Sequence, residues 1–175
     1  SLIFPFFSWA QSEVDSMLIN SENQFRDSIA AINLASEQQQ FLEESFNAAT
    51  DFMNSEDYTN AIKNLNQVLS VDSTYIDAYF NRAVCQQKLN NYELSILDFK
   101  LVYDLDSTRS DALFEQALCF MHNNYTKQAE ELFTQILVLF PTHAKSAYEL
   151  GVLHYLQKDY SSAITAFTKS LSIEN

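Results

Sequence analysis

The sequence predicts an all-α protein built from stacked helical hairpins, and three observations carry this prediction. Four segments of the chain align with one another, starting at residues 42, 76, 110 and 144, a constant step of 34 residues. Within each segment, apolar residues recur at helical spacing in two runs that a short polar break separates. The 175 residues include one glycine and two prolines, too few for the many tight turns of a β-sandwich or barrel.

The first ten residues, SLIFPFFSWA, are strongly apolar and have two possible interpretations. They are too few to cross a bilayer, which takes about 20 residues, so no membrane span is expected. They resemble the end of a secretory signal peptide, because Ser8 and Ala10 supply the small residues that precede a cleavage site. In this interpretation the protein is exported, to the periplasm or cell envelope. In the alternative, the protein is cytoplasmic and the segment is an apolar arm that packs on the fold or on a neighbouring molecule.

Residues 11–41 are expected to form a degenerate helical hairpin that caps the array. Within them, FRDSIAAINLA matches YSSAITAFTKS near the end of the chain. The matched residues are Phe25 with Tyr160, Ser28 with Ala163, Ile29 with Ile164, Ile32 with Phe167 and Ala35 with Ser170. We interpret Asn20–Asn23 as the break between the two helices. Terminal units of helical arrays are atypical because one of their faces meets water.

The four repeats span residues 42–75, 76–109, 110–143 and 144–175, and each should contain two antiparallel helices. The breaks between the paired helices are Ser55-Glu56-Asp57, Asn90-Asn91, Asn123-Asn124 and Lys158-Asp159. Asparagine tolerates the left-handed backbone conformation that ends a helix. Asp57, Asn91 and Asp159 are then placed to cap the next helix. Between repeats, Thr74 with Asp77 and Thr108 with Asp111 have the spacing of a capping box.

Small and large residues occupy matching positions of the four repeats. The eighth position holds Ala49, Ala83, Ala117 and Gly151; the twentieth holds Ala61, Ser95, Ala129 and Ala163; the twenty-fourth holds Leu65, Phe99, Phe133 and Phe167. This pattern resembles the tetratricopeptide repeat family over residues 42–175. The resemblance implies a right-handed superhelical solenoid of antiparallel helix hairpins. It also implies a non-catalytic module for protein–protein interaction, with the first helix of each repeat lining a concave groove.

The resemblance implies that the second, fifth, ninth, twelfth and thirteenth positions of each first helix face the groove, and the candidate groove residues come from the last four. They are Phe46, Phe80, Phe114 and Tyr148 at the fifth position, Thr50, Val84, Leu118 and Val152 at the ninth, Met53, Gln87, Met121 and Tyr155 at the twelfth, and Lys88 at the thirteenth. Aromatic rings and methionines suit an apolar or amphipathic protein segment. In the alternative interpretation, the rings pack between successive first helices and belong to the core. Some family members grip a C-terminal carboxylate with Asn and Lys, but the ninth position here holds no Asn.

Charge and composition exclude several other functions. The net charge is 10 − 23 = −13, so nucleic acid would be repelled and is not an expected partner. A single glycine excludes a Gly-rich phosphate loop, and the three histidines lack metal-ligand spacing. We therefore expect no catalytic residue, no metal and no cofactor. Cys85 and Cys119 lie 34 residues apart at one repeat position. They are predicted to be reduced buried thiols, because packed helices are about 8–10 Å apart, too far for a disulfide.

Three questions stay open at the level of sequence. The chain could be the substrate-presenting or regulatory repeat domain of a larger enzyme instead of a free-standing module. It could also be a self-associating scaffold that dimerises through the N-terminal arm or through the C-terminal end, where Ile164 and Leu171 are apolar. Arg82 occupies a position that is normally apolar, so it should either pair with a buried acid or reach the groove.

Overall fold

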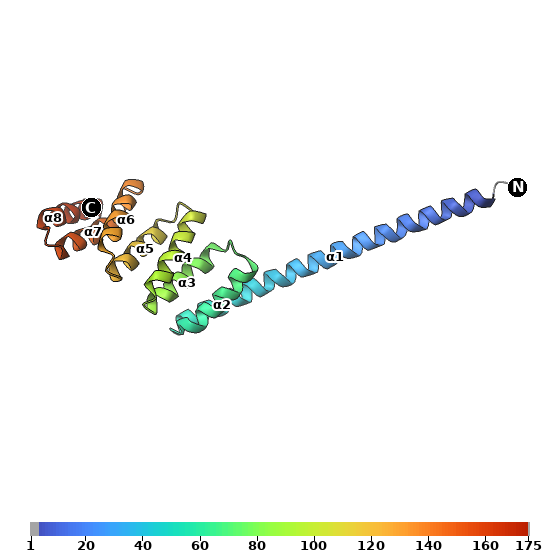
Figure 1. Cartoon of the computed structure of the whole chain (residues 1–175), viewed down its shortest axis with the longest axis horizontal. Helices are drawn as coiled ribbons and strands as arrows, with labels where there is room; N and C mark the ends of the chain where they lie inside the picture. Colours follow the sequence, from blue (N-terminus) through green and yellow to red (C-terminus); the bar gives the residue numbers. More distant parts are fainter. Residues whose placement is uncertain (1–3, 175) are drawn as a thin grey trace. The chain divides into compact units, whose positions relative to one another are not determined.

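The computed structural model describes the backbone of residues 4–174, and the side chains of residue 13 and of residues 15–173. This part of the chain contains eight helices and no strand (Figure 1). The helices are α1 (Phe4–Asn54), α2 (Tyr58–Val71), α3 (Ile76–Lys88), α4 (Tyr92–Leu105), α5 (Ser110–His122), α6 (Thr126–Leu139), α7 (Ala144–Leu156) and α8 (Tyr160–Glu174). The chain divides into two compact units, one ending at Glu43 and the other beginning at Glu44.

The second unit is an all-α solenoid in which each helix from α2 to α7 packs on the helix that follows it (Figure 1). Its core is divided into clusters that each join one hairpin to the first helix of the next. Phe99 of α4 packs with Ala83 of α3 and Cys119 of α5. Phe133 of α6 likewise packs with Ala117 of α5 and Leu153 of α7. Each repeat is therefore held by its nearest neighbours, as in other linear arrays.

Small residues allow the two helices of a hairpin to approach closely. Ala49, Ala83 and Ala117 at the eighth position have no exposed surface, nor do Ala61 and Ala129 at the twentieth. The space beside them is filled by the large twenty-fourth residue, which is fully buried in the first three repeats: Leu65, Phe99 and Phe133. This alternation of small and large residues gives the close packing that a folded core needs.

The turn inside each hairpin repeats one backbone geometry. Glu56, Asn90, Asn124 and Lys158 have φ between 60° and 65°, the left-handed conformation predicted for the breaks. In each turn the N–H of the following residue donates to a carbonyl five residues earlier, for example Asn91 to Gln86 at 2.8 Å. This is the Schellman arrangement, which satisfies carbonyls at a helix C-terminus. The predicted stop signals between paired helices are thus confirmed.

Helix starts follow the sequence prediction only in part. Asp57 and Asp159 do cap α2 and α8, since their carboxylates accept from the N–H groups of Asn60 and Ser162, both at 3.1 Å. The predicted cap at Asn91 is wrong, because its side chain makes no capping bond at the start of α4.

The two predicted capping boxes between repeats are also wrong. The residues that precede α3 and α5 are Tyr75 and Arg109, and neither caps with its side chain. Thr74 donates its N–H to Asp72 Oδ1 (2.8 Å), and Thr108 does the same to Asp106 Oδ1 (2.9 Å). The aspartate two residues earlier therefore holds each threonine in a local turn, in competition with the helix.

The hairpin predicted for residues 11–41 is wrong, because α1 is one continuous helix through this stretch, Asn20–Asn23 included. A packed hairpin here would have to cover one face of the first helix of repeat 1, and the residues on that face explain why none forms. At the third and tenth positions of later first helices, the fully or almost fully buried residues are Ala78 and Cys85, Ala112 and Cys119, and Ser146 and Leu153. Repeat 1 has the exposed Glu44 and Asp51 there. A packed hairpin would bury both carboxylates at high cost.

The predictions for the first ten residues stay predictions. Residues 1–3 lie outside the described residues, and residues 4–10 are described only as backbone of α1. No helix in the described part of the chain combines the length and apolarity needed to cross a membrane.

Candidate functional site

The predicted groove residues all lie on the C-terminal part of α1 and on α3, α5 and α7. Their spacing of three or four residues places them on one face of each helix, which we call the first-helix stripe. All of them are half-buried except Lys88, Tyr148 and Tyr155, which are exposed. The stripe therefore presents partly accessible apolar surface in every repeat.

Aromatic rings at the fifth position pack across their own hairpin. The ring centroids of Phe80 and Phe99 are 5.4 Å apart with the rings edge to face, a favoured aromatic geometry. Phe114 packs on Phe133 at 6.0 Å, and Tyr148 on Phe167 at 5.5 Å. These three rings therefore belong in part to the hairpin core, and their accessible surface contributes to the stripe.

The residue immediately before the next first helix also contacts the fifth-position ring in the first three repeats. Tyr75 lies 5.1 Å from Phe46 and His143 lies 5.2 Å from Phe114, measured between ring centroids. The guanidinium of Arg109 lies 4.7 Å from the centroid of Phe80, in a cation–π contact. Sequence reasoning missed these three residues, although their 34-residue spacing marks them as equivalent.

A pocket of about 820 Å³ opens where repeats 3 and 4 meet; we call it the groove pocket. Its lining comes from three helices: Phe114 and Leu118 of α5, Lys145, Tyr148 and Glu149 of α7, and Phe167, Ser170 and Leu171 of α8. Phe114, Leu118 and Tyr148 were predicted from the sequence, whereas the residues of α8 were not. The pocket is mainly apolar with one amine and one carboxylate, and burial raises the pKa of Glu149. Such a site can hold bulky apolar side chains and orient them with a few polar groups.

The charges at the second position of the first helices change along the array. Repeats 2 and 3 carry Asp77 and Asp111, and Arg109 contacts both, at 3.2 Å and 2.9 Å. Repeat 4 has Lys145 at this position. One guanidinium is therefore shared by two carboxylates near Phe80, whereas Lys145 places an amine beside the groove pocket.

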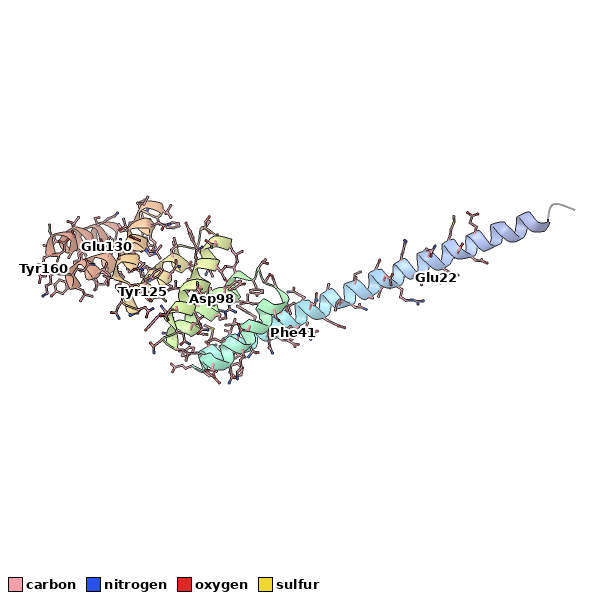
Figure 2. The ribbon with its side chains drawn as sticks, in the orientation of Figure 1. Glu22, Phe41, Asp98, Tyr125, Glu130 and Tyr160 are labelled. Carbon is pink, nitrogen blue, oxygen red and sulfur yellow. The ribbon has the colours of Figure 1, made fainter. Side chains whose placement is uncertain are left out.

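Arg82 lies on α3, where it pairs with a buried acid, the first of the two alternatives that the sequence left open. Its Nε and Nη2 donate to the two carboxylate oxygens of Asp98 on α4, both at 2.7 Å, and its Nη1 donates to Asn66 at 2.7 Å. The Asp98 side chain is only 8% exposed (labelled in Figure 2). Arg82 therefore connects α4 of its own repeat to α2 of the preceding repeat. It takes no part in the first-helix stripe.

The two cysteines are free and buried, as predicted. Burial raises the pKa of Cys85 to about 11, which keeps the thiol protonated and unreactive at neutral pH. Among the residues that the structure describes, no group of three or more His, Cys, Asp or Glu side chains could hold a metal ion.

Comparisons with known proteins agree with this architecture. The sequence model of a family described as tetratricopeptide repeat matches residues 46–110 and 122–173. The MamA fragment from Desulfovibrio magneticus RS-1 is 20% identical, with a TM-score of 0.70 over 76% of this chain and 75% of that one. The second TPR domain of human RPAP3, solved with an HSP70 peptide, is 20% identical, with a TM-score of 0.60 over 66% and 97%. The Arabidopsis OM64 TPR domain is 15% identical, with a TM-score of 0.61 over 67% and 98%. These identities show likeness of fold alone, and no curated protein matches the chain.

Proposed function

Because the chain belongs to the tetratricopeptide repeat family, we propose that its first-helix stripe binds a segment of another protein, with the groove pocket as the anchor point. The observation that carries this proposal is the convergence of Phe114, Leu118 and Tyr148 in one pocket. They come from two successive repeats, and the resemblance to the repeat family assigns all three to the groove. In this proposal the chain is a non-catalytic interaction module.

The lining of the groove pocket suggests the chemistry of the bound segment. Most of the lining is apolar, so a bulky aliphatic or aromatic side chain would fill the pocket and supply most of the binding energy. Lys145 and Glu149 offer one charge of each sign beside it. The net charge of −13 favours a neutral or basic segment over an acidic one. An apolar or amphipathic segment therefore fits best.

The site does not favour recognition of a C-terminal carboxylate. The RPAP3 domain named above was solved with the peptide SGPTIEEVD. In the present chain the ninth position of the first helices holds Thr50, Val84, Leu118 and Val152, none of which can donate a pair of amide hydrogen bonds. We therefore propose that the bound segment is recognised through its apolar side chains and not through its terminus.

Selection from a phage-displayed library of random 12-residue peptides tests the proposal. A peptide selected on the parent chain should lose affinity about tenfold or more with Leu118→Ser, which removes an apolar wall of the pocket. The matched control is Val138→Ser on α6, where the parent side chain is 72% exposed and outside the pocket. Equal affinity of the selected peptides for both variants, or failure to select any peptide, contradicts the proposal.

We also propose that the protein is exported, an inference that rests only on the apolar run followed by Ser8 and Ala10. The intact mass of the protein purified from its native host tests this directly. A mature chain that begins at Gln11 supports export, whereas a chain that retains residues 1–10 contradicts it.

A further inference from the structure

The N-terminal part of α1 carries large apolar side chains in an exposed position. Every residue from 15 to 41 is exposed, including Leu18 at 56%, Phe25 at 70% and Ile32 at 68% (Glu22 and Phe41 mark this stretch in Figure 2). Helices in water gain most of their stability by packing an apolar face against a partner. This stretch of α1 therefore needs a partner to cover it.

Three of these apolar residues lie on one seam with coiled-coil spacing. Leu18, Phe25 and Ile32 are spaced by seven residues and take the a positions of a heptad. Ser21, Ser28 and Ala35 follow three residues after each of them and take the d positions. Every a residue is large, every d residue is small, and none of the six is charged. We call these six residues the α1 seam.

This distribution of sizes selects the direction of a paired helix. In a parallel pair, a faces a′ and d faces d′, so Phe25 would oppose Phe25 and Ser28 would oppose Ser28, crowding one layer and leaving a gap in the next. In an antiparallel pair, a faces d′. One register then pairs each large residue with a small one: Leu18 with Ala35, Ser21 with Ile32, and Phe25 with Ser28. The two seams interlock only when they run in opposite directions.

We propose that two copies of the chain pair through the α1 seam as an antiparallel helical dimer. The register given above is symmetric about a point between Arg26 and Asp27, so the contact has a two-fold axis there and closes as a dimer. The occupant of the seam is thus a second copy of the same helix, because the seam is complementary to itself.

The rest of the chain supports this choice of occupant. Ser28 and Ala35 match Ala163 and Ser170 of α8, which are 2% and 6% exposed. Ser170 donates its hydroxyl to the carbonyl of Ala144 at 3.0 Å, on the paired helix α7. The same pattern of small residues therefore already serves helix packing within a hairpin. Repeat 1 of the same chain is a poor partner for the seam, because it presents Glu44 and Asp51 on the face that would have to cover it.

The molar mass of the full chain tests the dimer. Light scattering at about 10–100 μM should give twice the chain mass of 20.1 kDa. Ile32→Ser should weaken the dimer about tenfold or more, because each dimer buries that side chain twice. The matched control is Leu34→Ser, since Leu34 is 57% exposed and faces away from the seam. A monomeric parent overturns the proposal, as does a dimer that Ile32→Ser leaves intact and Ile164→Ser at the C-terminal end abolishes.

Distances between spin labels test the direction of pairing. Single labels are placed at Asn23→Cys and at Glu37→Cys, both on the outer side of the proposed pair, while the buried Cys85 and Cys119 stay unlabelled. In the antiparallel register, two labels at position 23 are separated by about 10 Å along the helix axis and two at position 37 by about 31 Å. A clearly longer distance at position 37 supports the proposal. Similar short distances at both positions would show a parallel pair and overturn it.

Discussion

Arg82 and Asp98 form a charged pair at two positions that are both apolar in repeat 4. The corresponding residues of repeat 4 are Leu150 and Ala166. Asp98→Ala should lower the free energy of unfolding by about 2 kcal/mol, because it leaves the half-buried Arg82 guanidinium beside Asn66 with no charged partner. The double variant Arg82→Leu/Asp98→Ala copies repeat 4 and should be close to the parent. Urea denaturation compares them, and an equal loss in the single and double variants would contradict this account.

Gly151 is the one eighth-position residue without a methyl group, and its surroundings explain why. A Cβ atom there would lie 2.6 Å from Cδ1 of Phe167. Gly151→Ala should therefore lower the free energy of unfolding by about 1 kcal/mol, because the clash outweighs the better helix propensity of alanine.

The background of Phe167→Leu provides the matched control for this glycine. It recreates the pairing of Ala49 with Leu65 in repeat 1, which removes the clash. In that background Gly151→Ala should raise the free energy of unfolding by up to about 1 kcal/mol. The same sign of change in both backgrounds, measured by urea denaturation, would refute the steric explanation.

At the scale of the element, each turn inside a hairpin depends on one left-handed residue. Lysine tolerates this conformation less well than asparagine, and Lys158 has φ 65° while Asn124 has φ 62°. Lys158→Gly should raise the free energy of unfolding by about 0.5–1 kcal/mol, and Asn124→Gly should change it less. Thermal and urea unfolding of both variants check this, and a loss of stability in Lys158→Gly would contradict it.

The start of α7 depends on a neutral histidine. His143 Nδ1 accepts from the N–H of Ser146 at 3.2 Å, and burial lowers the pKa of His143. Since the folded pKa lies below the unfolded value of about 6.5, the unfolded chain binds more protons as the pH falls. The stabilisation is therefore present above pH 6.5 and is lost in more acidic solution.

The histidine makes stability depend on pH in a way that one substitution can isolate. The free energy of unfolding of the parent should fall more between pH 7.5 and 5.5 than that of His143→Asn, because asparagine caps a helix at every pH. Urea denaturation across that range gives the two slopes. Parallel slopes would show that another group is responsible.

The sequence predicts the helices and turns that follow the 34-residue pattern. It does not predict the helix starts at which local hydrogen bonds replace the expected cap. The hairpins of residues 42–175 followed from the shared small and large positions, and the left-handed turns followed from Asn90 and Asn124. The predicted capping boxes do not form, because the hydroxyls of the two threonines donate to the carboxylates of Asp72 and Asp106 instead. The predicted N-terminal hairpin is absent although residues 25–35 match a second helix, because that match does not reveal the exposed carboxylates of Glu44 and Asp51 on repeat 1.

The lining of the groove pocket was predicted in part. The family resemblance assigned Phe114, Leu118 and Tyr148 to the groove, and these three residues do line the pocket. The contributions of Phe167, Ser170 and Leu171 depend on how α8 approaches α7, which periodicity within one helix does not specify. The sequence leaves open whether the fifth-position rings line the groove or belong to the core. In the structure, Phe80, Phe114 and Tyr148 each pack on a ring of their own hairpin.

At the scale of the second unit, the two ends of the solenoid differ in polarity. Repeat 1 presents the exposed Glu44, Asn47 and Asp51, whereas repeat 4 exposes Ile164 at 67% and Leu171 at 61%. In the first three repeats, the residues at the position of Ile164 are no more than half-exposed. Stacking of repeat 1 on the apolar end of another molecule would bury these carboxylates, so their desolvation opposes such stacking.

Removing this polarity should turn the chain into a polymer. In Glu44→Ala/Asp51→Leu, repeat 1 presents the small and apolar residues that later repeats bury, so head-to-tail stacking becomes favourable and does not close. Light scattering should show a mass that rises continuously with concentration. The control Glu44→Gln/Asp51→Asn keeps the face polar and should retain the parental mass. A double variant that also retains it would contradict the assigned role of the carboxylates.

The same asymmetry of the ends gives the array a direction in which it can lengthen during evolution. A duplicated 34-residue unit inserted after repeat 4 would pack its first helix on the apolar surface of α8. A unit inserted between two repeats would contact matching surfaces on both sides. A unit added ahead of repeat 1 would have to bury Glu44 and Asp51 until further substitutions removed them. Gene duplication can therefore extend this solenoid toward its C-terminus in one step, while growth toward the N-terminus requires several coordinated changes.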